Sequence, residues 1–158
     1  VKIACLAQLV NVIAPIMTSD TGAWRQTIFY PYMHASTMGV GTVLNTIVKS
    51  PVYESGNYGD APYLDSVVVM NEEEETVTIF AVNKDLEEDM QVVCDLRQFS
   101  GYQVKEHLVL THNDMKAENT EKNPNEVVPH GNGVSKVENG HLHAIFGKHS
   151  WNVIRLAK

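Results

Sequence analysis

The pattern of apolar and polar residues changes once along the chain, near residue 41. Residues 1–7, VKIACLA, form an almost continuous apolar run, which is typical of a strand buried on both faces of a parallel sheet. Residues 24–36, WRQTIFYPYMHAS, carry apolar side chains at helical spacing, and we expect the helix itself to begin near Pro31 and to end at Gly39 and Gly41. The first part of the chain therefore predicts one strand followed by one helix.

Beyond residue 41 the spacing becomes strand-like. Short segments rich in Val, Ile, Thr and aromatic residues alternate with turn residues such as Asn139-Gly140, which predicts an antiparallel sandwich or barrel. Alternation within residues 76–82 predicts a strand with one solvated and one buried face. The polar stretch 113–134 predicts a long loop. The expected strands cover residues 42–48, 64–70, 76–82, 90–96, 102–110, 141–146 and 151–156.

These two patterns predict two domains of unequal completeness. A single strand–helix unit cannot bury both of its apolar faces, so residues 1–41 are expected to be the end of one domain. Residues 42–158 are long enough for a complete second domain. We therefore expect the chain to be the C-terminal portion of a larger protein.

Composition narrows the classes of partner. The 158 residues carry a net charge of -7 at pH 7, which argues against a nucleic-acid-binding surface. No apolar stretch approaches the roughly 20 residues that a membrane-spanning helix needs. Both cysteines, Cys5 and Cys94, have apolar neighbours and are expected to be buried free thiols in a reducing compartment, which indicates a cytoplasmic protein.

Gln8 is the candidate binding residue. It follows the predicted strand 1–7 at its carboxyl end, where parallel barrels carry their sites. A carboxamide offers one acceptor atom and two donor hydrogens, which suit a sugar hydroxyl. The alternative is that Gln8 only caps free backbone groups at the strand end. Asn11 also follows this predicted strand, but we expect it to order the loop and not to bind a ligand.

The other candidate chemistry is weaker. His141 and His143 lie on one side of a predicted strand, but no third metal ligand accompanies them, so we expect surface histidines and no metal site. Glutamates at residues 72–75 fall on a predicted hairpin turn and are expected to be solvated. Asp20 is the only acid among residues 1–45, so a pair of catalytic carboxylates is not expected in this chain.

Three stretches resemble the C-terminal third of the α-L-arabinofuranosidases of glycoside hydrolase family 51. They are VKIACLAQLVNVIAPIMT at the start, AWRQTIFYPYMHAS at residues 23–36, and THNDMKAENTEKNPNEVVP at residues 111–129. The stretch TMGVG at residues 37–41 departs from the family, which more often has an aromatic residue before the first Gly and Arg between the two glycines. That departure concerns the contacts that follow the helix.

The resemblance implies a mainly β fold class. Residues 42–158 would form an antiparallel jelly-roll-like β-sandwich, and residues 1–41 the last strand–helix unit of a (β/α)8 barrel. Gln8 matches the Gln of the family's AQLVN motif, which contacts the arabinofuranose at the cleavage subsite. Trp24, Phe29 and Tyr30 would pack mainly between the barrel end and the sandwich. The alternative for Trp24 is that it borders a sugar site at the barrel mouth.

The implied protein is a cytoplasmic, retaining, exo-acting arabinofuranosidase without metal or organic cofactor. It would act on arabinan- or arabinoxylan-derived oligosaccharides, with its two catalytic glutamates on the preceding barrel, and would form a homo-oligomer. The isolated chain is expected to be inactive. Two alternatives stay open: a non-catalytic carbohydrate-binding or interaction sandwich, and a small metal-dependent β-barrel enzyme.

Overall fold

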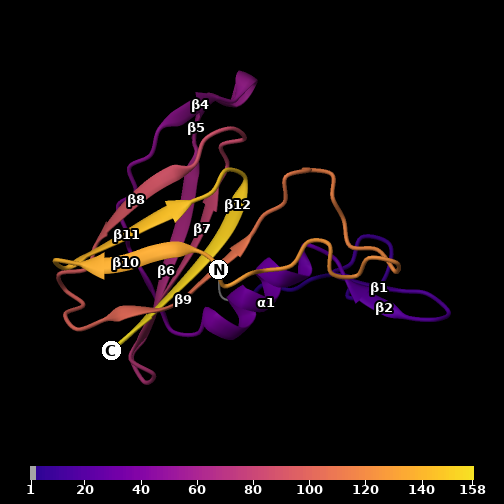
Figure 1. Cartoon of the computed structure of the whole chain (residues 1–158), viewed down its shortest axis with the longest axis horizontal. Helices are drawn as coiled ribbons and strands as arrows, with labels where there is room; N and C mark the ends of the chain where they lie inside the picture. Colours follow the sequence, from indigo (N-terminus) through magenta and orange to yellow (C-terminus); the bar gives the residue numbers. More distant parts are fainter. Residues whose placement is uncertain (1–2) are drawn as a thin grey trace.

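The computed structural model describes residues 3–158, and it is dominated by antiparallel strands (Figure 1). The first part contains β1 (Ile16–Thr18), β2 (Ala23–Arg25) and the helix α1 (Phe29–Met38). The strands that follow are β3 (Thr42–Leu44), β4 (Val52–Glu54), β5 (Asp60–Pro62), β6 (Leu64–Asn71), β7 (Thr76–Asn83), β8 (Met90–Asp95), β9 (Gln103–Leu110), β10 (Val134–Glu138), β11 (His141–Phe146) and β12 (Ser150–Ala157). A short 3-10 helix, Gly56–Tyr58, separates β4 from β5.

Two antiparallel sheets form a sandwich. One has the strand order β3-β6-β7-β12-β9 and the other has the order β10-β11-β8. The main core lies between them and includes Leu142 and Phe146 from one sheet and Ile154 and Leu156 from the other. The mainly β, antiparallel sandwich expected from the sequence is confirmed.

The five-stranded sheet is covered on its outer face as well. Phe80 and Val153 are buried there, with Met38 of α1 packed against them. The prediction that residues 76–82 have one solvated face is therefore wrong, since Thr78 and Phe80 are both buried. The alternation of Thr with apolar residues in this strand predicts a solvated face. In the folded chain α1 covers that face, which the local sequence does not indicate.

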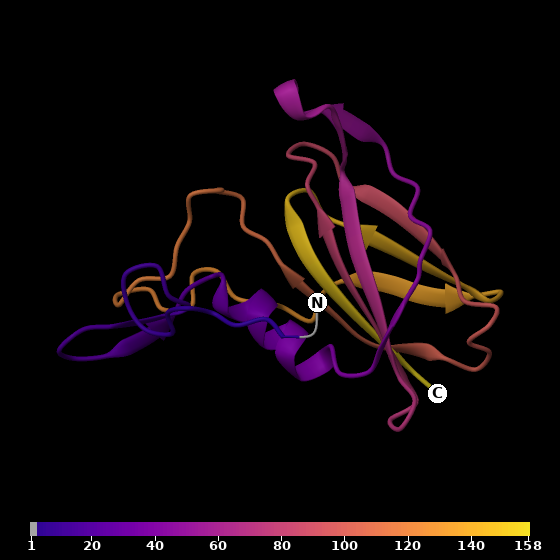
Figure 2. The same cartoon turned by 180° about the vertical axis from the view of Figure 1, so that it is seen from behind.

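A second, smaller body lies beside the sandwich. The hairpin of β1 and β2 and the long loop between β9 and β10 run side by side at the end of the molecule away from the sheets (Figures 1 and 2). Tyr30 of α1 packs with Leu110 and Val127 in a separate apolar cluster between this body and the sandwich. Phe29 also joins that cluster, so both aromatics pack beside the sandwich as expected, whereas the barrel end stays a prediction.

Most predicted strands match the observed ones within two residues. Asn139-Gly140 forms the predicted turn between β10 and β11, with positive φ at both positions. The strand expected at residues 42–48 ends at Leu44, because the chain then leaves the sheet edge. The sequence did not predict strands β4, β5 and β10. In β10 the reason is its polar content, since Ser135, Lys136 and Glu138 accompany only two valines.

Residues 3–7 differ from the prediction, which gave a strand there. Val1 and Lys2 lie outside the described residues, and Ile3 and the four residues after it form no strand. A parallel strand takes its hydrogen bonds from neighbouring strands, and no strand of the described chain pairs with this segment. The helix expected to begin near Pro31 is confirmed as α1, which begins at Phe29, while Trp24 lies before it and pairs with Met17 in the β1–β2 hairpin.

Candidate functional site

Gln8 lies in the exposed segment that leads into β1. Its Nε2 donates hydrogen bonds to the backbone oxygen of Asn11 at 3.0 Å and, more weakly, to that of Val10 at 3.5 Å. The side chain thus folds over the start of the next turn. This geometry leaves the carboxamide oxygen as the free acceptor of the group.

Asn11 orders this loop, as the sequence predicted. Its side-chain Oδ1 accepts a hydrogen bond from the backbone N–H of Thr18 at 2.7 Å, and its Nδ2 donates to Thr18 Oγ1 at 2.8 Å. The backbone N–H of Asn11 donates to the oxygen of Ile16 at 2.8 Å. These bonds close the loop between Gln8 and β1 onto the first strand of the hairpin.

The long loop after β9 holds the hairpin in place. Asn119 is buried, and its Nδ2 donates to the backbone oxygens of Arg25 and Val127 at 2.9 and 3.0 Å. Glu121 accepts hydrogen bonds from the hydroxyls of Ser19, at 2.6 Å, and Thr21. These two hydroxyls lower the pKa of Glu121, because they stabilise its ionised form.

Two buried histidines form hydrogen bonds with side chains of β12. His34 on α1 accepts a hydrogen bond at Nδ1 from the indole N–H of Trp151 on β12, at 3.1 Å. His107 on β9 bonds through Nε2 to Oδ1 of Asn152 at 3.2 Å, and its Nδ1 is buried without a partner. Burial lowers the pKa of both imidazoles, so both are neutral at pH 7.

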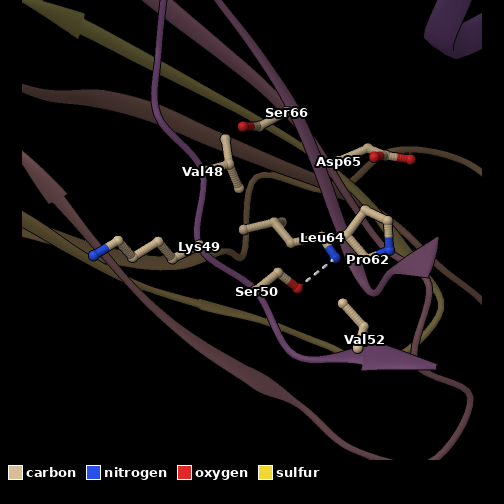
Figure 3. A pocket seen from close by; sticks show the side chains of 8 residues that line it. All are labelled: Val48, Lys49, Ser50, Val52, Pro62, Leu64, Asp65 and Ser66. Carbon is tan, nitrogen blue, oxygen red and sulfur yellow. Dashed lines mark hydrogen bonds between the residues drawn. The ribbon is translucent and has the colours of Figure 1, made fainter. Parts of the chain in front are cut away.

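The cavities of the sandwich lie away from Gln8. One, of about 460 Å³, sits at the base of the β4–β5 hairpin and is lined by Val48, Ser50, Pro62 and Leu64 among others (Figure 3). The hydroxyl of Ser50 is already used, because it accepts a hydrogen bond from the backbone N–H of Leu64 at 3.0 Å. A larger groove of about 1330 Å³ runs beside β8. Gln8 lines neither of them.

Nothing in the described residues assembles a metal centre. His141 and His143 have ring centroids 6.4 Å apart, and no cluster of three or more His, Cys, Asp or Glu forms a ligand set within residues 3–158. Both cysteines are free thiols, but Cys5 is exposed and Cys94 is half-buried, which corrects the expectation that both are buried. No helix in this part of the chain combines the length and apolar character needed to cross a membrane.

The comparisons with known proteins agree with this architecture. Residues 1–150 match the family model described as the α-L-arabinofuranosidase C-terminal domain. The chain belongs to this family. It is 58% identical, over its full length, to two proteins named intracellular exo-α-(1→5)-L-arabinofuranosidase, from Halalkalibacterium halodurans and Bacillus subtilis. It spans 31% of the length of each of these relatives.

Solved structures of family 51 arabinofuranosidases share this fold. A family 51 α-L-arabinofuranosidase from Bifidobacterium longum matches 94% of this chain with a TM-score of 0.87 and 33% identity, over 29% of its own length. The arabinofuranosidase of Thermotoga petrophila shares the fold, with a TM-score of 0.80, 24% identity, and coverage of 94% of this chain and 32% of its own. The chain is thus the C-terminal portion of a family 51 arabinofuranosidase, as the sequence motifs indicated.

Sequence reasoning missed the residues that connect the hairpin to the sandwich in this family member. Asn119 and Glu121 lie in a polar loop, where such residues usually face solvent. The motif 111–129 marked the loop as distinctive, but nothing local assigns Asn119 a backbone partner 94 residues away. His34 was missed for the same reason, since its partner is 117 residues distant.

Proposed function

We propose that this chain is part of a retaining, exo-acting α-L-arabinofuranosidase that removes terminal arabinofuranosyl groups from arabinan- or arabinoxylan-derived oligosaccharides. The observation that carries the proposal is the 58% identity, along the entire chain, to two relatives named as exo-α-(1→5)-L-arabinofuranosidases. Because the chain spans 31% of those relatives, most of the catalytic machinery is assigned to the remainder of the enzyme.

In this proposal residues 1–41 complete a (β/α)8 barrel and residues 42–158 form the supporting sandwich. Two glutamates on earlier barrel strands act as nucleophile and acid/base, at the separation of about 5 Å that double displacement requires. Gln8 lines the arabinofuranose subsite, which is consistent with its exposed position and its free acceptor oxygen. No acid of this chain is given a catalytic role, and no cofactor is required.

The partners proposed are the oligosaccharide, the N-terminal barrel and further copies of the enzyme in a homo-oligomer. A cytoplasmic location is proposed because the relatives are named intracellular enzymes. The linkage in their names makes α-1,5-linked arabino-oligosaccharides the first substrates to test.

The test compares a complete enzyme that ends in this chain with the isolated chain. We expect the complete enzyme to cleave an aryl α-L-arabinofuranoside and to release α-L-arabinofuranose first, as monitored by NMR, whereas the isolated chain should give no turnover. Gln8→Ala in the complete enzyme should lower kcat/KM about tenfold, because one hydrogen bond to the sugar is lost. Cleavage by the isolated chain, or inversion at the anomeric carbon, would contradict the proposal.

One observation favours a second candidate function, a sugar-binding sandwich. Tyr58 at the tip of the β4–β5 hairpin is 93% exposed, as expected for an aromatic ring that stacks on sugars. Calorimetric titration of the isolated chain and its Tyr58→Ala variant with arabino-oligosaccharides separates the two functions. Binding that Tyr58→Ala abolishes supports the binding module, and absence of heat supports a purely structural sandwich.

A further inference from the structure

We propose that Asn11 and Thr18 are positioning residues that hold the side chain of Gln8 with its oxygen turned outward. In that orientation Gln8 accepts a hydrogen bond from a sugar hydroxyl and does not donate one. This inference rests on the proposed function, in which Gln8 lines the arabinofuranose subsite.

Two hydrogen bonds fix the orientation of the Gln8 carboxamide. Its nitrogen faces the backbone oxygens of Asn11 and Val10, at 3.0 and 3.5 Å, and only a donor is stable against two carbonyl oxygens. The oxygen on the opposite side has no hydrogen-bond partner among the described residues. The group is exposed, so this acceptor is available to a ligand.

The backbone oxygen that accepts the shorter Gln8 hydrogen bond lies in a tight turn. The carbonyl oxygen of Asn11 also accepts a hydrogen bond from the backbone N–H of Ala14 at 3.1 Å, so its direction is fixed by a tight turn. Asn11 has a φ of 64° and Val12 a φ of 61°, both in the left-handed region. Asn tolerates this region, whereas a β-branched residue such as Val12 adopts it only where surrounding contacts impose it.

The contact between Asn11 and Thr18 holds this turn in place. The Asn11 side chain bonds to two groups of Thr18, its backbone N–H at 2.7 Å and its hydroxyl at 2.8 Å. Thr18 is the last residue of β1 and pairs with Ala23 of β2, so it is part of a regular hairpin. The Asn11–Thr18 pair therefore transfers the rigidity of the hairpin to the loop that carries Gln8.

The arrangement predicts that Asn11 affects catalysis only through Gln8. A side chain misplaced by about 1 Å costs up to about a hundredfold in rate, so loss of the clamp should resemble loss of Gln8 itself. In a complete enzyme ending in this chain, Asn11→Ala should lower kcat/KM about tenfold. In a Gln8→Ala background the same change should lower it further by less than about twofold.

Three companion variants separate positioning from folding. Asn11→Gly keeps the left-handed backbone accessible but removes the clamp, so it should retain the melting temperature and still lose about tenfold in kcat/KM. Thr18→Val removes the hydroxyl and should lower kcat/KM by a smaller factor. Thr18→Ser keeps the hydroxyl and should therefore keep kcat/KM unchanged. The matched control is Asn123→Ala, since Asn123 is exposed and its side chain bonds only to Glu126 of the same long loop.

The outcomes distinguish the two claims. If Gln8→Ala lowers kcat/KM but Asn11→Gly and Thr18→Val leave it unchanged, the positioning role is wrong and the role of Gln8 stands. If the Asn11 and Gln8 effects are additive, Asn11 acts independently and the inference is overturned. If Gln8→Ala leaves kcat/KM unchanged, the proposed sugar contact itself is wrong, and the positioning role falls with it.

Discussion

The indole N–H of Trp151 donates a hydrogen bond to Nδ1 of His34 across 3.1 Å, joining the last strand of the sandwich to the only α-helix of the described residues. The Trp151 ring also stacks on Phe80, with centroids 5.9 Å apart. His34 is buried, so its acceptor atom depends on this single donor for satisfaction. This contact fixes α1 against the outer face of the five-stranded sheet.

Trp151→Phe should lower the free energy of unfolding by about 2 kcal/mol, because a buried acceptor on His34 loses its donor while an aromatic ring stays on Phe80. Trp24→Phe is the matched control, since the buried indole N–H of Trp24 has no partner and its removal breaks no hydrogen bond. Thermal unfolding of the two variants measures the difference. Equal destabilisation would show that the Trp151–His34 bond contributes nothing.

Stability should fall as the pH drops from about 7 to 5. The pKa of His34 is lowered by burial, partly offset by Glu106, and that of His107 is lowered by burial, partly offset by its bond to Asn152. The unfolded chain, with histidine pKa values near 6.5, therefore binds more protons than the folded chain in this range. The stabilisation is complete above the unfolded pKa and is lost as the pH falls toward the folded one.

The test of this pH effect uses urea unfolding at a series of pH values. His107→Gln should flatten the slope between pH 7 and 5, because glutamine does not titrate. Carboxylates with lowered pKa, such as Glu121, act mainly below their ordinary value of 4.5 and so leave this window unaffected. A slope that is unchanged in both His107→Gln and His34→Gln would contradict the assignment.

Asn119→Ala should be strongly destabilising, by about 3 kcal/mol. The change leaves the backbone oxygen of Arg25 and both backbone groups of Val127 without their partners, in a site where Asn119 is 1% exposed. For a chain of this length that corresponds to a fall of about 9 °C in the melting temperature. Asn123→Ala, in the same loop but exposed, should change stability by less than about 0.5 kcal/mol.

Gly133→Ala should also destabilise the protein, because a Cβ at this position would overlap the imidazole ring of His107. The ring is buried against Phe146 and held by Asn152, so it cannot move aside without breaking contacts. Gly131→Ala in the same loop is the matched control, since a Cβ there meets nothing within 4 Å. We expect a loss of about 2 kcal/mol for the first and little change for the second, measured by chemical denaturation.

Local sequence was sufficient for most of the sandwich. Strands β6, β7, β11 and β12 follow from their apolar residues, and the β10–β11 turn follows from Asn139-Gly140, because strand period and turn conformation depend on neighbours in sequence. The motif containing Gln8 indicated the family, and the position of Asn11 indicated its ordering of the loop. The subsite role of Gln8 stays a prediction.

What the tertiary structure alone decided is how residues 3–38 are held. Trp24 lies ahead of the predicted helix, and only its pairing with Met17 shows that it belongs to a hairpin strand. Asn119 and His34 find their partners 94 and 117 residues away, and such bonds leave no periodic trace in the sequence. Periodicity therefore determined which segments are strands, whereas long-range hydrogen bonds, which depend on how the chain folds back on itself, determined what those strands support.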